Sequence, residues 1–493
     1  MKLARILQGA TVIRQDAEAA LEVEKITADS RSASPGCLFI AVPGFKVDGH
    51  DFVSAAARAG ASVALTERWL DGIGIPQVQV PLTRLAMAQA AANFYDRPSE
   101  KLTVIGITGT NGKTTTSFLV DSILKADGRK TGLIGGIEYR LGSRTKKAVR
   151  TTPEPLELQD MLSEIADSGA ETATLEVSSH GINLYRAACT DFKVAVFTNL
   201  TPDHLDLHRD MESYFRTKKR LFSGELNGPG EISGYALPEA AVNIDDAYGK
   251  RLAAAIAPER LVTFGRSSAA GIYAIKIRKK SWQSDFDLVT PQGSAAVSLK
   301  LPGDHNIANS LAAAACAHTL GIDTGVIAAG LGGLESVPGR FEPIATEAPF
   351  NVVVDYAHNV DGLQKVMKAA VGLTEGKLIL VFGCPGDRDR DKRPQMGLVA
   401  GSKADISVLT TDDCYSEEPE QILDEVEPGL RESGGRYLRI SDRRRAIEAA
   451  LAEAGPGDLV LIAGKGHETT QLMPSGPVPF SDSETVRELL RDS

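Results

Sequence analysis

The sequence has few cysteines, no long apolar run and no excess of basic residues. Its five cysteines are scattered through 493 residues and form no C-x-x-C pair, so we expect neither a disulfide framework nor a cysteine zinc site. No stretch approaches the roughly 18 apolar residues of a membrane span, and the N-terminus has no apolar signal-peptide region. The net charge of −10 argues against a nucleic-acid partner. These absences predict a cytoplasmic protein without membrane insertion.

The sequence does contain an alternation of strand-like and helix-like segments that is long enough for three domains. At roughly 150 residues per domain, we place them at 1–99, 100–337 and 338–493. The runs CLFIAV and SVALTE predict a small N-terminal α/β domain. LTVIGIT, TATLEV and VAVFTNL predict a central parallel sheet covered on both faces, and NVVVDYA, KLILVFG, ISVLTT and DLVLIAG predict a C-terminal Rossmann-like domain. The expected fold class is therefore α/β.

The run GITGTNGKTT, between a strand-like and a helix-like segment, predicts a phosphate-binding P-loop in the central domain. Glycines let backbone N–H groups face phosphate oxygens at a helix N-terminus. We expect Lys113 to bind the β- and γ-phosphates of ATP and the Thr114 hydroxyl to bind Mg²⁺. The usual G-x-x-x-x-G-K-[ST] pattern is missed by one residue, because position 107 is Ile107. The predicted ATP-binding residues of this loop are Gly109, Thr110, Asn111, Gly112, Lys113, Thr114 and Thr115.

Two further segments carry metal-ligand types directly after strand-like runs. Glu176 ends the run TATLE, at the edge of a parallel sheet where a Mg²⁺ ligand is needed. The segment NLTPDHLDLH (199–208) adds two histidines and two carboxylates. It is compatible with a plain polar loop, with a second Mg²⁺ site or with a substrate-phosphate site.

Together these motifs resemble the Mur ligases, the amide-forming enzymes of peptidoglycan precursor synthesis. TGTNGKTT, LEVSSHG, NLTPDHLD-x-H, GDHN-x-x-N, PGRFE and DYAHN occur in order, and the match runs from about residue 25 to 485. Within that family, DSR (29–31), TTPE (151–154), SSHG (178–181) and GKGHE (464–468) most resemble the UDP-N-acetylmuramoyl-tripeptide synthetases. Those enzymes add the third amino acid to UDP-MurNAc-L-Ala-D-Glu.

The resemblance implies an ATP- and Mg²⁺-dependent reaction through an acyl phosphate of the D-Glu γ-carboxylate, which the amine of a free diamino acid then attacks. The family's catalytic positions match Lys113, Glu176, His204 and Lys218. Its metal-binding positions match Thr114, Glu176, His204 and Lys218. Lys218 corresponds to a lysine that the family carbamylates; spacing alone would favour an ordinary solvated helix lysine. We also expect a monomer.

The resemblance also assigns binding residues. For the nucleotide it implies Asn306, Arg340, Asp355 and His358, and the segment GFKVDGH (44–50) matches the uridine pocket. Leu184 stands where some relatives carry a polar contact. For the UDP-linked dipeptide it implies Ser30, Thr151, Thr152, Ser178 and Arg186.

The incoming amino acid is expected at Arg388, Asp413, Gly464 and Glu468. The bidentate guanidinium of Arg388, in GDRD, suits an α-carboxylate. Members that add diaminopimelate carry D-N-P-R, which is absent from TDDCYSEEP (411–419). Because this segment is acidic at Asp413, Glu417 and Glu418, we expect L-lysine or ornithine, with meso-diaminopimelate as the alternative.

Two other functions stay open from the sequence. A folylpolyglutamate-synthase-like ligase would share the chemistry, but the DSR and TTPE elements and the large N-terminal domain count against it. A P-loop NTPase acting as a regulatory switch would leave the GKGHE and GDRD motifs without a role.

Overall fold

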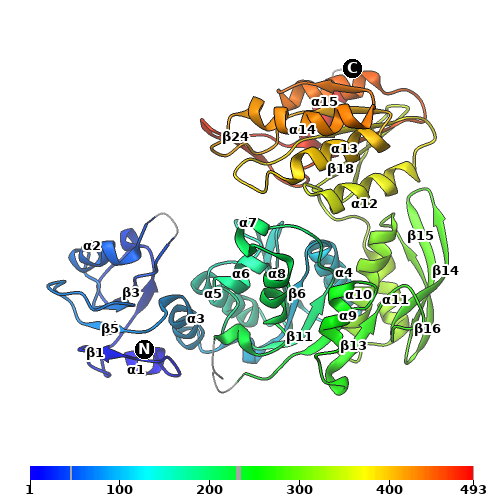
Figure 1. The fold of residues 1–493 in the computed structure, drawn as a ribbon. Helices are drawn as coiled ribbons and strands as arrows, with labels where there is room; N and C mark the ends of the chain where they lie inside the picture. The colour runs from blue at the N-terminus through cyan, green and yellow to red at the C-terminus, as the bar shows by residue number, and fades with distance from the viewer. Residues whose placement is uncertain (45–46, 229–234, 492–493) are drawn as a thin grey trace.

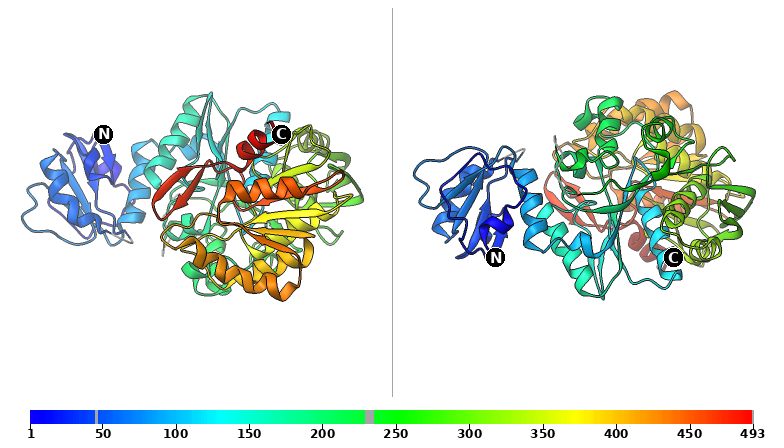
Figure 2. Two further views of the ribbon diagram at one scale, coloured as in Figure 1. Left: turned by 90° about the horizontal axis from the view of Figure 1, so that it is seen from above. Right: turned by 90° about the horizontal axis from the view of Figure 1, so that it is seen from below.

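The computed structural model describes residues 1–44, 47–228 and 235–491, which form three α/β units (Figure 1). The N-terminal unit has a sheet in the order β1 (Arg14–Gln15), β5 (Gln77–Gln79), β4 (Val63–Thr66), β3 (Cys37–Ile40) and β2 (Lys25–Thr27). Its helices are α1 (Leu3–Ile6), α2 (Val53–Arg58) and α3 (Thr83–Phe94). Viewed from above and below, this unit stands to one side of the other two (Figure 2).

The central unit has an eight-stranded sheet. In order, its strands are β13 (Leu261–Phe264), β12 (Glu239–Asn243), β11 (Phe192–Phe197), β6 (Thr103–Thr108), β10 (Thr172–Glu176), β7 (Thr131–Ile134), β8 (Glu138–Leu141) and β9 (Arg144–Lys147). Its helices are α4 (Lys113–Ala126), α5 (Pro155–Asp167), α6 (Ser179–Asn183), α7 (Leu205–His208), α8 (Met211–Lys219), α9 (Ala247–Ala253), α10 (Asp304–Thr319) and α11 (Thr324–Gly333). Separate buried clusters cover the two faces, one around Phe118 and Leu311 and one around Leu162 and Phe215.

The central sheet is parallel at the strands predicted from the sequence, but one edge that was not predicted is antiparallel. β8 and β9 pair antiparallel with their neighbours, because β7, β8 and β9 are joined by connections too short for a parallel crossover. The chain also forms an unpredicted antiparallel sheet of β14 (Tyr273–Lys280), β15 (Gln283–Thr290) and β16 (Gly293–Leu299). Every second side chain of β15 is buried, including Phe286 and Leu288, which is the period of a strand with one solvated face.

The C-terminal unit has a six-stranded sheet in the order β17 (Glu342–Ile344), β18 (Asn351–Asp355), β22 (Leu459–Ala463), β19 (Leu378–Phe382), β20 (Ile406–Leu409) and β21 (Tyr437–Arg439). All neighbours are parallel except β17 and β18. The remaining elements are α12 (Val360–Val371), α13 (Lys392–Lys403), α14 (Pro419–Ser433), α15 (Arg443–Glu453), α16 (Asp482–Arg491) and the hairpin β23 (Thr470–Met473)–β24 (Gly476–Pro479). Apolar clusters on both faces confirm the predicted doubly covered sheet.

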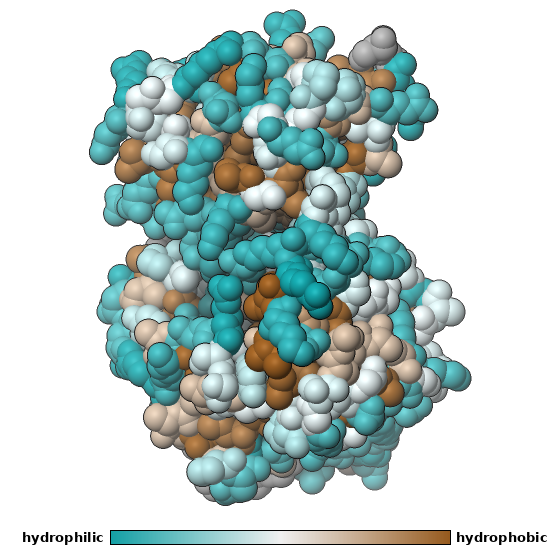
Figure 3. Space-filling model, turned by 90° about the vertical axis from the view of Figure 1, so that its right-hand side faces the viewer, coloured by the Kyte–Doolittle hydropathy of each residue, from teal (hydrophilic) through white to brown (hydrophobic). Residues whose placement is uncertain are grey.

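The three-domain α/β architecture is thus confirmed, while the boundaries near 99 and 337 stay predictions. All five cysteines are buried and free, as expected. No helix in the described part of the chain is long and apolar enough to cross a membrane. A constriction lined largely by hydrophilic side chains separates the central and C-terminal units (Figure 3), and several of the residues predicted for the nucleotide line a cavity between these units.

Candidate active site

The phosphate loop joins the carboxyl end of β6 to the first turn of α4. Gly109 and Gly112 have φ of +150° and +88°, and a Cβ at either position would overlap Thr198 or Asn309. Glycine is therefore required at both positions, by conformation and by space. Nζ of Lys113 donates to the backbone oxygens of Gly109 (3.0 Å) and Thr110 (2.9 Å), so it lies over the loop that it is predicted to serve.

The two predicted Mg²⁺ ligands of the first site lie together. Oγ1 of Thr114 donates to Oε2 of Glu176 at 2.9 Å, and Oε1 of Glu176 accepts from the Gly136 amide at 2.9 Å. Nη2 of Arg340 donates to the Thr114 hydroxyl at 3.2 Å. A buried carboxylate beside a hydroxyl is a donor set that suits Mg²⁺, and Nε of Arg340 is buried without a partner among the described residues. Thr114 and Glu176 are thus suited to hold a metal ion, and Arg340 is suited to bind a phosphate beside it.

His204 and Lys218 approach the same loop from the other side. Nζ of Lys218 donates to the Gly109 oxygen at 2.9 Å, and its side chain is 1% exposed. Burial, with Lys113 nearby, lowers the pKa of Lys218 well below its ordinary value. His204 has φ of +54° and stands 3.8 Å from the carboxylate of Asp203; burial lowers its pKa to about 3. Both nitrogens are therefore biased towards the neutral form that binds metal or CO₂.

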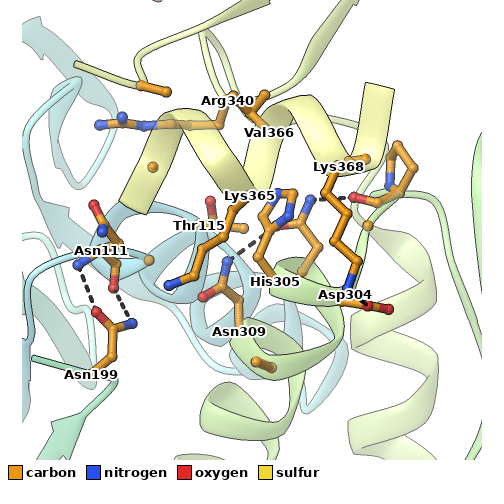
Figure 4. A pocket seen from close by; sticks show the side chains of 18 of the residues that line it. Asn111, Thr115, Asn199, Asp304, His305, Asn309, Arg340, Lys365, Val366 and Lys368 are labelled. Atoms are coloured by element: carbon orange, nitrogen blue, oxygen red, sulfur yellow. Dashed lines mark hydrogen bonds and ion pairs between the residues drawn. The ribbon is translucent and has the colours of Figure 1, made fainter. Parts of the chain in front are cut away.

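Seven of the eleven predicted ATP-binding residues line one cavity of about 490 Å³ between the central and C-terminal units (Figure 4). Asn306 is fixed by donating to the Pro302 oxygen (2.8 Å) and accepting from Asn309 (3.1 Å). Asp355 accepts from the Phe341 and Ala357 amides, both at 2.7 Å, and burial raises its pKa. The other predicted residues on the cavity wall are Asn111, Gly112, Thr115, Arg340 and His358.

Hydrogen bonds across this cavity were not predicted from the sequence. Nδ2 of Asn111 donates to Asp361 on α12 at 2.7 Å, and Nδ2 of Asn359 donates to Asp203 at 3.0 Å. The partners lie 250 and 156 residues apart. Both asparagines and Asp203 belong to motifs that the sequence analysis identified. Neither the spacing of these residues along the chain nor their charge, however, indicates that they contact one another. The C-terminal unit is thus bonded directly to the phosphate loop.

Four of the five residues predicted for the UDP-linked dipeptide lie next to the metal site. Oγ1 of Thr152 donates to the backbone oxygen of Glu176 (2.9 Å) and lies 3.1 Å from Oγ of Ser178. Arg186 donates to the Thr152 oxygen at 3.3 Å, and Thr151 lies beside Gly136. Ser30 is instead on the short helix Ser30–Ser32 of the N-terminal unit. In the segment predicted for uridine, residues 45 and 46 lie outside the described residues.

The predicted amino-acid pocket is centred on a buried lysine that sequence reasoning missed. Nζ of Lys465, which is fully buried, donates to Asp413 and to Glu468, both at 2.7 Å. Gly464, beside it, has φ of +119°, and a Cβ there would overlap Oδ2 of Asp412. That buried oxygen accepts no hydrogen bond within the described part of the chain. Lys465 is the second residue of the GKGHE motif, but the resemblance assigned a binding role only to Gly464 and Glu468 of that motif.

Two of the three carboxylates on which the lysine or ornithine expectation rested do not contribute acidity to this site in the fold. Glu417 binds the buried Arg393 (2.8 Å) and Arg390 (2.9 Å) instead of facing the pocket, and Arg393 lowers its pKa to about 2. Glu418 is exposed just before α14. Asp413 is neutralised by Lys465. Of the three carboxylates counted in the sequence, only Asp413 contributes to the pocket, and it is already paired.

Comparison with known proteins agrees with this geometry. The chain matches the Mur ligase middle domain over residues 107–317, the Mur ligase glutamate ligase domain over 339–466 and the Mur ligase family catalytic domain over 22–95. It is 42% identical to the UDP-N-acetylmuramoyl-L-alanyl-D-glutamate–2,6-diaminopimelate ligase of Alkaliphilus metalliredigens, covering 100% of this chain and 98% of that protein. The chain belongs to the Mur ligase family. As a Mur ligase it is an ATP-dependent amide ligase that uses Mg²⁺.

Two further similarities carry the same name. The ligase of that name from Geobacillus kaustophilus is 42% identical, over 96% of this chain and 95% of its own. A solved structure described as UDP-N-acetylmuramoyl-L-alanyl-D-glutamate–2,6-diaminopimelate ligase superposes with a TM-score of 0.68 at 31% identity, covering 100% of this Mur ligase and 99% of that chain. These names do not support the lysine or ornithine expectation. They favour its alternative.

Proposed function

We propose that this Mur ligase adds meso-diaminopimelate to UDP-N-acetylmuramoyl-L-alanyl-D-glutamate, through an acyl phosphate, in peptidoglycan precursor synthesis. The observation that carries the proposal is the full-length similarity, at 42% identity, to ligases named for that reaction. The proposal is also supported by the surroundings of Glu417, which is paired with Arg393, and of Glu418, which is exposed, since these two carboxylates were part of the argument for a different amino acid.

In the proposed reaction the loop around Lys113 and the guanidinium of Arg340 hold the phosphates. ATP supplies the phosphoryl group, and Thr114 and Glu176 would hold the Mg²⁺ that offsets its charge. Little covalent chemistry is left for the protein in phosphoryl transfer, so placement of cations and amides supplies most of the rate. Arg340 bonds Thr114 from a segment at the start of the C-terminal unit, which makes its position depend on how the two units meet.

The proposed acceptor carboxylate comes from the dipeptide held near Thr152, Ser178 and Arg186. Thr152 is bonded to the backbone of Glu176, so the end of the dipeptide site borders the metal site. This continuity supports direct attack of a carboxylate oxygen on the γ-phosphate, because reacting groups must be held within a few ångströms.

Lys218 has the environment that its proposed carbamylation needs. Its amine is buried, beside Lys113 and bonded to a neutral carbonyl. A neutral amine can attack CO₂, forming an N–C bond and releasing a proton, and the resulting carbamate would be an anionic ligand opposite His204.

The decisive experiment measures phosphate release with UDP-MurNAc-L-Ala-D-Glu, ATP and Mg²⁺ while the amino acid is varied. We expect turnover with meso-diaminopimelate and a kcat/KM at least about 100-fold lower with lysine or ornithine, because buried polar groups that lose their partner reject an analogue strongly. A preference for lysine would overturn the proposed amino acid. Release that is indifferent to dipeptide and amine would overturn the ligase assignment itself.

A further inference from the structure

Arg388, which is predicted to hold the incoming α-carboxylate, lies against Tyr415, each on the loop that follows one of two neighbouring strands, β19 and β20. The guanidinium carbon of Arg388 lies 4.8 Å from the centre of the Tyr415 ring, and its Nη2 lies 3.3 Å from the phenol oxygen. A guanidinium can only donate hydrogen bonds, so the phenol oxygen is the acceptor. The phenol O–H hydrogen is therefore not used in this contact and can be donated elsewhere.

The backbone is unfavourable at Tyr415 and at Asp387, the residue before Arg388. Asp387 and Tyr415 have φ of +50° and +51°, which non-glycine residues rarely adopt. The amides of Cys414 and Tyr415 both donate to the Leu472 oxygen, at 2.7 and 3.0 Å. The amide and hydroxyl of Ser416 donate to the Asp387 carboxylate, at 3.1 and 2.8 Å. Backbone strain that the surroundings enforce points to a functional constraint.

The charges of the pocket leave Arg388 available to an anion. Lys465 is engaged by two carboxylates, Asp413 and Glu468. Arg388, by contrast, contacts only the neutral oxygens of Tyr415 and Asp387 within the described part of the chain. Burial raises the pKa of Tyr415, so its phenol keeps its proton at neutral pH. The pocket mouth thus offers one charged and one neutral donor side by side.

We propose that Tyr415 is a binding residue for the incoming amino acid: it holds the Arg388 guanidinium over its ring and donates its own O–H to the carboxylate that Arg388 binds. The inference rests on the proposed function, and it assigns a role within TDDCYSEEP, the segment that lacks D-N-P-R. Two donors from separate loops fix both the place and the orientation of a carboxylate better than one mobile arginine does.

The test compares steady-state kinetics of wild type, Tyr415→Phe and Tyr415→Leu with diaminopimelate. Phe removes only the hydroxyl, and we expect the KM for diaminopimelate to rise about tenfold, as for a hydrogen bond to a charged group. Leu also removes the stacked ring, and we expect a further rise of a few fold. In both variants kcat and the KM values for ATP and the UDP-linked dipeptide should stay within twofold of wild type.

Tyr437→Phe is the matched control, because Tyr437 contacts Arg431 in the same unit through its hydroxyl but lies on β21, in contact with α14. A double variant with Arg388→Ala adds a second readout: if both side chains hold one carboxylate, the two fold-changes should not multiply. A wild-type KM in Tyr415→Phe, or an equal rise in all three KM values, would overturn the inference alone. Absence of wild-type turnover with diaminopimelate would instead overturn the proposed function.

Discussion

The phosphate loop and the amino-acid pocket are built in opposite ways. The loop is one contiguous segment between β6 and α4, and its proposed binding atoms are largely backbone amides and the side chains of Lys113 and Thr114. The pocket is assembled from the loops after β19, β20 and β22, and its character depends on which charges pair there. Contiguous sites can be predicted from a motif, whereas assembled sites depend on partners that the motif does not contain.

The largest expected effect breaks the contiguous site. Lys113→Ala should lower kcat by about 1,000-fold or more, because a positioned cation over a developing phosphoryl charge is lost. The measurement is ADP formation under saturating substrates. Lys125→Ala, on the exposed side of the same helix, is the control and should stay within twofold. A loss of less than tenfold in Lys113→Ala would contradict the assigned role.

The next effect breaks the assembled site. Lys465→Met leaves Asp413 and Glu468 without their buried counter-ion, and removing one partner of a buried ion pair costs about 3 kcal/mol of stability. We expect a lower midpoint of thermal unfolding and a KM for diaminopimelate raised at least about tenfold, since 1.4 kcal/mol of binding corresponds to that factor. The KM for ATP should not change. Exposed Lys403→Met is the control, and a selective rise in the KM for ATP would argue against a separate pocket.

A smaller effect tests whether Glu417, in the acidic segment TDDCYSEEP, is held by Arg393 in the fold. Glu417→Gln should lower the free energy of unfolding by about 1–2 kcal/mol at pH 7, because a charged hydrogen-bond acceptor for Arg393 is lost. The pKa of Glu417 is lowered to about 2 in the fold, so its contribution is present above about pH 5 and is lost as the pH falls towards 2.

The difference between wild type and Glu417→Gln should therefore shrink between pH 7 and pH 3 when unfolding midpoints are compared. Glu418→Gln changes the neighbouring exposed residue and should have no such dependence. Equal pH profiles for the two variants would show that Glu417 is not held as the structure describes.

The smallest expected effect is at a contact between the units that carry the two sites. Trp282, between β14 and β15, packs against the apolar core of the C-terminal unit, and it is one of only two tryptophans in the chain. In a Trp69→Phe background we expect its emission to shift when an ATP analogue and Mg²⁺ are added, because the nucleotide cavity lies between the central and C-terminal units and its occupation should change the contacts between them. Trp282→Phe is the control. An unchanged spectrum would count against movement at this contact.

Much of the fold could be predicted because its strands carry their own signals. β18, β19, β20 and β22 are mostly apolar, as is typical of parallel strands buried on both faces. The antiparallel edge at β8 and β9 and the sheet of β14 to β16 were missed. Their strands are half-exposed and polar, so their pairing depends on short turns and one buried face.

The sequence by itself determined the family and the phosphate chemistry, because the glycines, Lys113 and Thr114 of the loop act within a single turn between strand and helix. Only the tertiary structure decided the character of the amino-acid pocket. Glu417 is neutralised by Arg393, 24 residues away, and Asp413 by Lys465, 52 residues away. Coulomb energy depends on distance in space, so the charge of a segment says little about the charge of the pocket that it borders.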